Sequence, residues 1–261
     1  MEIIKIILRA LWRVWFYVTA GFIIIILLPV LMVLTSNDQF YPYFFKLARW
    51  WAKVVLFLMG FKVKVQGNQK FEEGKSYMFS ANHTSMIDVF VMLAVVKNPF
   101  VFVGKYELVK LPVFGFFYKR TCILVDRSDP ESRKNVYQSA QRKLKRGFSV
   151  CIFPEGLVPK DENIVLSEFK NGVFSLSIEH QIPIVPMAFY DCKKRFSYTI
   201  TSGSPGILRV KILDIIETQN LTLNDKNRIR EKAFNMMYQE LITDLENQQL
   251  KQNEKQTHQI L

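Results

Sequence analysis

The feature that most constrains this chain is an apolar segment near its N-terminus. No charged residue occurs between Val14 and Asn37. About 20 apolar residues span a bilayer as a helix, so the segment is long enough to enter a membrane. The basic residues Lys5, Arg9 and Arg13 precede it, which favours a cytoplasmic amino end.

Two other interpretations of this segment are a secretory signal peptide and the buried helix of a soluble protein. The apolar run is longer than a signal peptide requires, and no small-residue cleavage site follows it before Asp38. A buried helix has the same composition. Trp12, Trp15 and Tyr17, however, suit the level of lipid headgroups, which favours the membrane.

Residues 41–61 form a second segment with a different pattern. Lys46, Arg49 and Lys53 share one face of a helix, and aromatic and aliphatic residues supply the rest. The pattern is typical of a helix that lies in the membrane interface. It is equally typical of a helix packed on a domain with its lysines in water, so both interpretations stay open.

The cysteines bear on the side of the membrane. Cys122, Cys151 and Cys192 are too few and too scattered for a disulfide framework or a zinc site, and they indicate a reducing, cytosol-facing location. A single span with its amino end inside would place the rest of the chain outside. We therefore predict that residues 1–61 form a helical hairpin, whose first helix enters the bilayer and whose second returns along its surface.

Charge narrows the classes of partner. The chain has 35 Lys and Arg against 23 Asp and Glu, a net charge of +12, which predicts nucleic acid, anionic lipid or a phosphorylated substrate as partner. With three histidines and three cysteines, a metal site is not expected. The sequence contains no glycine-rich phosphate loop or dinucleotide fingerprint, so nothing supports a nucleotide-driven reaction.

Residues 62–246 alternate between strand and helix patterns, which favours an α/β domain with a mixed, largely parallel sheet flanked by helices. Pro186 is compatible with a strand only near an edge or a bulge. From residue 247 to residue 261 the chain is polar and is expected to be a loose tail. The predicted strands are 62–66, 76–80, 100–103, 122–125, 149–153, 184–189, 196–201 and 208–215, and the predicted helices are 85–96, 130–146, 169–180 and 223–246.

His83 and Asp88 carry the first chemical signal. His83 lies in a turn after a strand, and Asp88 lies in the first turn of the next helix. The imidazole can therefore fold back onto the carboxylate, as in a general base whose tautomer is set by an acid. The alternative is purely structural, because Ser85-x-x-Asp88 is a capping-box pattern and His83 can be an ordinary turn residue.

A second group of candidates follows other strands. Glu155, within Phe153–Gly156, stands at a strand's carboxyl end, where a carboxylate can accept hydrogen bonds from a polyol; it can equally be a solvated turn residue. Lys105, Arg127 and Lys170 stand in or beside loops. Single cations usually only solvate a surface, but several in one crevice bind phosphate.

These motifs resemble those of the 1-acyl-sn-glycerol-3-phosphate acyltransferases, of the bacterial type. Asn82–Asp88 resembles the family's Asn-His-x4-Asp motif. The second motif is matched by Lys105–Leu108 with Pro112, Gly115 and Arg127, the third by Phe153–Gly156, and the fourth by Ile182–Pro186. The four occur in the family's order over about residues 80–186.

The resemblance implies a glycerolphosphate acyltransferase-like fold and a role for each matched position. The protein would move an acyl group from acyl-CoA or acyl carrier protein to the sn-2 hydroxyl of lysophosphatidic acid, giving phosphatidic acid, with no cofactor or metal. It would act in the phospholipid of the cell inner membrane, on the cytoplasmic face. His83 would be the base and Asp88 its orienter, Arg127 and Lys105 would hold the acceptor's phosphate, Glu155 and Gly156 its glycerol, and Pro186 would shape the acyl site.

One departure leaves alternatives open. The third motif commonly continues Thr-Arg, whereas this chain has Leu157 and Val158; Lys160 or Lys170 could replace the missing charge. The acceptor could therefore be glycerol 3-phosphate, another lysophospholipid or a lyso-aminolipid. A non-enzymatic module that binds anionic lipid, for which His83 would not matter, is the rival from another class. Nucleic-acid binding is disfavoured by the lipid-inserted N-terminus.

Overall fold

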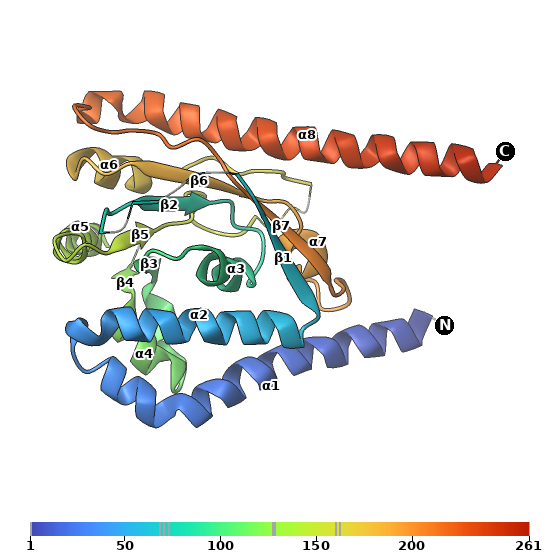
Figure 1. Ribbon diagram of the computed structural model, residues 1–261, viewed down its shortest axis with the longest axis horizontal. Coiled ribbons are helices and arrows are strands. Elements are labelled where there is room, and N and C mark those ends of the chain that lie inside the picture. The colour runs from blue at the N-terminus through green and yellow to red at the C-terminus, as the bar shows by residue number, and fades with distance from the viewer. Residues whose placement is uncertain are drawn as a thin grey trace.

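The computed structural model describes residues 2–67, 69, 71–72, 74–126, 129–159, 161 and 163–260. Its centre is a seven-stranded sheet of order β1-β7-β6-β2-β5-β3-β4 (Figure 1). The strands are β1 (Phe61–Gln66), β2 (Met78–Ala81), β3 (Phe100–Lys105), β4 (Ile123–Val125), β5 (Ser149–Cys151), β6 (Ile184–Phe189) and β7 (Gly206–Ile212).

Helices cover both faces of the sheet. Helices α6 and α8 lie on one face, and α2 and α3 lie on the other, with α1 against α2 at the outside (Figure 1). The helices are α1 (Glu2–Leu34), α2 (Tyr41–Leu58), α3 (Asp88–Val95), α4 (Phe114–Thr121), α5 (Pro130–Leu144), α6 (Gly172–Glu179), α7 (Cys192–Arg195) and α8 (Lys226–Ile260), and short 3-10 helices are η1 (Asp38–Phe40), η2 (Tyr106–Lys110) and η3 (Leu223–Asp225).

The sheet is mixed and largely parallel, as predicted. Strands β6, β2, β5, β3 and β4 run parallel to one another. Strands β1 and β7 are parallel to each other and antiparallel to β6. Every residue of β2 and β6 is buried, which explains why their sequences are continuous apolar runs with little alternation.

Pro186 lies inside β6, at an irregularity of the pairing. Ile184 bridges Ile216 and Met187 pairs with Ile212, so two residues on β6 stand opposite three on the other strand. The Pro186 carbonyl accepts a hydrogen bond from Leu213 N–H. The predicted need for an edge or bulge is therefore met by a bulge-like slip within the sheet.

Two predictions about the later chain were wrong. Residues 196–201 are not a strand: Phe196 is buried against Phe16 of α1, and Arg13 donates to the carbonyls of Ser197 and Ser202. Docking of α1 thus uses backbone groups that a strand would need. The last helix does not end at residue 246, because α8 continues to Ile260 and contains no glycine or proline to stop it.

Helices α1 and α2 form an antiparallel pair. The indole N–H of Trp12 donates to Met59 O (3.2 Å), and that of Trp51 donates to Ala20 O (3.1 Å). Among the described helices, α1 is long and apolar enough to cross a membrane. Only 11% of its most apolar 18-residue stretch is buried. The predicted hairpin therefore has a structural counterpart, although its first helix begins at Glu2, well before the apolar run.

One face of helix α2 packs on the domain, as one of the two open interpretations predicts. Ala52 and Val55 are buried, and Arg49 donates to Leu93 O (3.0 Å) and Ala94 O (3.4 Å) at the carboxyl end of α3. Those carbonyls would otherwise lack helix partners. Lys46 and Lys53 of the basic stripe stay exposed.

Candidate active site

The carboxyl ends of β2, β5 and β3, which are neighbours in the sheet, bring three predicted residues to one edge. His83 follows β2, Glu155 follows β5, and Lys105 ends β3. Parallel strands place their carboxyl ends together, and ligand crevices of open α/β sheets form at that edge.

His83 and Asp88 form a direct pair. His83 Nδ1 lies 2.9 Å from Asp88 Oδ2. A carboxylate at this place makes Nδ1 the protonated nitrogen and leaves Nε2 as the atom that can take a proton. The His83 side chain is 20% exposed whereas the Asp88 side chain is fully buried, so the base is open on one side and fixed on the other.

Asp88 also holds the turn that carries His83. The same oxygen, Oδ2, accepts the backbone N–H of Thr84 (2.7 Å) and of Ser85 (2.8 Å). The bonds to Thr84 and Ser85 confirm the capping interpretation, and the contact with His83 is the geometry that the catalytic interpretation requires. One oxygen, Asp88 Oδ2, therefore both stabilises the turn and orients the His83 imidazole.

Asn82 secures the start of this turn, a role that the sequence analysis did not assign. Its Nδ2 donates to Phe189 O (3.0 Å) and its Oδ1 accepts Phe189 N–H (2.7 Å). The side-chain amide of Asn82 thus makes the same pair of hydrogen bonds with Phe189 that a backbone residue extending β2 would make with β6. Ser85 is fully buried and donates to the carbonyl of Phe196 on the other side.

Glu155 is buried and uses both carboxylate oxygens on backbone groups. Oε1 accepts the N–H of His83 (2.7 Å), and Oε2 accepts the N–H of Ser167 (2.8 Å). Burial raises the pKa of Glu155, and the hydrogen bonds from His83 and Ser167 oppose that rise. Glu155 therefore joins the loop after β5 to the loop that carries the base.

Phe153 supplies one wall of the site. Its ring stacks on the His83 imidazole, with centroids 4.2 Å apart and planes 16° apart. The stack restricts rotation of the imidazole, whose other contacts come from Asp88. Phe153 was noted only as part of a motif, and its spacing from His83 along the chain gives no signal of this contact.

An apolar cavity of about 1310 Å³ adjoins His83. Its walls come from α1, α2, α3, β3, η2, α4 and the loops after β2 and β5. Aromatic and aliphatic side chains dominate the lining; among them are Phe16, Leu31, Trp51, Phe90, Phe117 and Phe153. A cavity of this size and composition suits a long hydrocarbon chain whose reactive end lies at His83.

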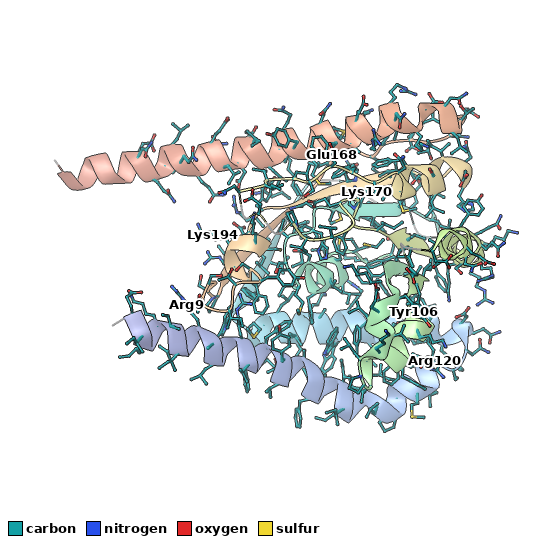
Figure 2. The ribbon with its side chains drawn as sticks, turned by 180° about the vertical axis from the view of Figure 1, so that it is seen from behind. Arg9, Tyr106, Arg120, Glu168, Lys170 and Lys194 are labelled. Atoms are coloured by element: carbon teal, nitrogen blue, oxygen red, sulfur yellow. The ribbon has the colours of Figure 1, made fainter. Side chains whose placement is uncertain are left out.

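The structure brings only some of the predicted cations to this cavity. Lys105 lines it. Lys170 is exposed and is not among the described lining residues; in the view of Figure 2 its label stands apart from those of Tyr106 and Arg120. Arg127 and Lys160 fall outside the described residues.

Lys193 of α7 was not predicted, yet it lines the cavity together with His83 and Thr84. Its Nζ donates to Ile164 O (3.1 Å), in the loop that follows the third motif. A lysine in a short basic run gives no sequence signal beyond surface charge. Lys193 is therefore a second described cation, besides Lys105, at the wall of the cavity that holds the base.

The remaining predicted positions divide between the cavity and the core. Gly156 lines the cavity with a backbone φ of +81°, a conformation in which a side chain is strained. Leu157 and Val158, which stand where Thr-Arg was expected, line it as well. Pro186 is buried in β6 and is not among the described lining residues.

The environment of Asp88 includes a buried thiol. Burial raises the pKa of Cys192 well above its ordinary value, and the neighbouring Asp88 carboxylate raises it further. A thiol kept protonated beside a carboxylate is no nucleophile at neutral pH. Among the described residues, no group of three or more His, Cys, Asp or Glu side chains could hold a metal ion.

A family described as Acyltransferase matches residues 62–190. The chain is 28% identical over 234 residues to human 1-acyl-sn-glycerol-3-phosphate acyltransferase alpha, covering 85% of this chain and 78% of that one. It is 28% identical to the human beta form and 27% identical to the Saccharomyces cerevisiae enzyme, and each alignment spans 63% of the relative, less than two thirds of its length.

A solved structure shares the fold. It is the crystal structure of the 1-acyl-sn-glycerophosphate acyltransferase from Thermotoga maritima, with a TM-score of 0.75 and 19% sequence identity. The superposition covers 93% of this chain and 97% of that one, so it includes the N-terminal helices as well as the sheet.

Proposed function

We infer that the chain belongs to the acyltransferase family that matches residues 62–190 and, within it, to the 1-acyl-sn-glycerol-3-phosphate acyltransferases. It transfers a fatty acyl group from a thioester to the sn-2 hydroxyl of lysophosphatidic acid and releases phosphatidic acid. The observation that carries this inference is the His83–Asp88 pair at the mouth of an apolar cavity.

The pair accounts for the chemistry of transfer. His83 Nε2 removes the proton of the acceptor hydroxyl while its oxygen attacks the thioester carbonyl. Asp88 stabilises the imidazolium through Nδ1–H. The tetrahedral oxyanion then collapses, the carbon–sulfur bond breaks, and the thiolate leaves and takes up a proton. Both substrates are present together, so no acyl-enzyme is formed.

The walls of the cavity account for the substrates. The acyl chain lies among the aromatic and aliphatic side chains, and Lys105 and Lys193 supply positive charge at the walls for a phosphate of the acceptor or the donor. Arg127 is proposed to bind the acceptor's phosphate on the basis of its motif alone. The donor is acyl-CoA or acyl carrier protein.

The protein acts at a membrane, and the pair of α1 and α2 is its anchor. Trp12 and Trp51 bond residues 12–20 of α1 to residues 51–59 at the end of α2, which supports a hairpin held against the domain and lying in one leaflet. The basic residues before the apolar run support the cytoplasmic face of the cell inner membrane. The bacterial type is proposed from the motifs of the sequence alone.

Acyl transfer from a long-chain thioester to lysophosphatidic acid tests the function, with membranes that carry either the native chain or His83→Ala. We expect native activity to fall at least about 100-fold in the variant, since a general base typically contributes 10²–10⁴. A matched control is His180→Ala, since His180 stacks on Tyr137 and neither residue is among the described lining residues of the cavity. Equal activity of the native chain and His83→Ala would contradict the mechanism.

A second candidate concerns the acceptor. Leu157 and Val158 make the wall after the third motif apolar where an arginine was expected. A less charged wall favours acceptors with a larger apolar or uncharged part. Competition between lysophosphatidic acid, glycerol 3-phosphate, other lysophospholipids and a phosphate-free lyso-aminolipid ranks them; a phosphate-free winner would remove the roles given to Lys105 and Arg127.

A further inference from the structure

The segment from Tyr106 to Arg120, which comprises η2, the turn after it and most of α4, exposes many large apolar side chains. They are Tyr106, Leu108, Leu111, Val113, Phe114 and Phe116, each between 37% and 49% exposed. Singly exposed apolar residues are common, but a cluster within one short segment marks an interaction surface.

Cations surround this cluster. Lys105, Lys110, Lys119 and Arg120 are all exposed, and the segment contains a single acidic residue, Glu107. The Arg120 guanidinium lies 3.5 Å from the centre of the Phe116 ring. Aromatic and basic side chains in this mixture suit the boundary between acyl chains and anionic headgroups.

The backbone of the segment is compact and strained at one position. A Cβ on Gly115 would lie 1.9 Å from Val109 O, so α4 packs directly on η2. Val113 has a φ of +61°, an unfavourable conformation for a β-branched residue. Strain of this kind persists only where the surrounding structure imposes it. The exposure is therefore built into the fold.

The segment is continuous with the membrane-associated helices. Leu108, Leu111 and Phe114 line one side of the apolar cavity, and Leu27 and Leu31 of α1 line it from another. Figure 2 shows Tyr106 and Arg120 on the segment, at the side of the molecule where α1 and α2 lie. The far side of the molecule is covered by α8 (Figure 1).

We propose that the 106–120 segment is a second membrane contact, which inserts its apolar side chains into the leaflet that holds α1 while its lysines and arginine bind anionic lipid headgroups. The cavity then opens into the bilayer between the segment and α1. Lysolipid enters and product leaves by lateral movement in the leaflet. This inference rests on the membrane-bound acyl transfer proposed above.

A polarity-sensitive fluorophore on Phe116→Cys tests the contact without an activity measurement. The label is attached at pH 7, where burial keeps the native thiols protonated; the pKa of Cys122 is raised to about 12, and those of Cys151 and Cys192 are raised well above their usual value. The matched control is the same label on Lys232→Cys, an exposed position of α8.

On vesicles of phosphatidylcholine and phosphatidylglycerol, we expect the emission at position 116 to shift to the blue and to be quenched by lipids with quenchers in their acyl chains. The label at position 232 should show neither effect. Equal responses at the two positions would overturn the proposal. The label at position 116 is measured with native His83 and with His83→Ala, which keeps the two ideas separate. Insertion in both, with activity lost only in His83→Ala, supports the contact and the enzyme. Activity with native His83 but no insertion overturns the contact and leaves the enzyme supported.

Charge reversal tests the headgroup contact. Lys119→Glu with Arg120→Glu should lower the lipid-exposed fraction of the position-116 label at least about tenfold on phosphatidylglycerol vesicles, since each cation near an anionic surface contributes substantially. Lys232→Glu with Lys251→Glu makes the same change in net charge on α8 and should leave that fraction unchanged. Inorganic phosphate should not compete; if it displaces the label, the cations bind free phosphate and the proposal is wrong.

Discussion

The carboxylate of Glu155 binds the backbone of His83, with 2.7 Å between Oε1 and the His83 nitrogen. Its other oxygen binds Ser167 N–H, so one buried side chain connects the loop of the base with the loop after β5. The family resemblance implied that Glu155 holds the acceptor's glycerol, and a solvated turn residue was the alternative. The geometry supports a positioning residue that acts on substrate through His83.

Glu155→Gln distinguishes these two roles. The amide keeps the size of the side chain but turns an NH₂ group toward one of the two backbone N–H donors. An unsatisfied buried donor costs about 1–3 kcal/mol, which displaces the base. We expect kcat to fall about 10- to 100-fold with the KM for the acceptor nearly unchanged. A raised acceptor KM with native kcat would instead establish direct contact with glycerol.

Asp88→Asn separates the folding role of this carboxylate from its catalytic role. Asparagine can still accept the N–H bonds of Thr84 and Ser85, so the turn is retained. It cannot stabilise a charged imidazole in the same way, and we expect acyl transfer to fall by about 10² or more. Circular dichroism and membrane binding of the variant serve as controls. Near-native activity would show that His83 needs no charged partner.

The cysteines provide a pH-dependent prediction. Burial, as the main cause, raises the pKa of Cys122 from 9.0 to about 12. At pH 9 the native thiol is protonated while the unfolded thiol is half ionised, so alkylation of Cys122 in the native protein should be about 10³-fold slower than in the unfolded chain. Mass spectrometry after timed alkylation measures both rates, and similar rates would show that the site is open.

The same shift predicts the sign of a stability change. Unfolding releases a proton from Cys122 at any pH between the two pKa values, so this thiol's contribution to stability is complete below about pH 9 and declines as the pH rises toward about 12. Cys122→Ala should reduce the slope of stability against pH in that range, as measured by thermal unfolding. An unchanged slope would show that the pKa of Cys122 is not raised in the folded protein.

Arg209 connects the sheet to α8. It is bonded to Asp191 (2.8 Å) and to Asp244 of α8 (2.6 Å), and it is only partly exposed. Arg209→Met should lower the free energy of unfolding by about 1–3 kcal/mol, because two largely buried carboxylates lose their partner. Thermal unfolding measures the loss. Lys251→Met, at an exposed position of the same helix, should change it little; equal effects would mean that the ion pairs contribute nothing.

Local patterns in the sequence were sufficient for much of the architecture. The apolar runs of β2 and β6, the bonds of Asp88 to Thr84 and Ser85, and the apolar stretch of α1 reflect patterns and interactions within short stretches of the chain. Such interactions follow from hydrophobic periodicity and turn chemistry. The α/β class, the hairpin of helices and the His83–Asp88 pair were therefore predictable.

Only the tertiary structure decided the contacts between distant segments. Glu155 meets His83 across 72 positions of sequence, Asn82 meets Phe189 across 107, and Arg13 meets Ser197 across 184. The last of these removed a predicted strand. Whether a polar side chain binds solvent, substrate or backbone depends on which buried groups lack a partner after the chain has packed, and periodicity along one sequence carries no information about that.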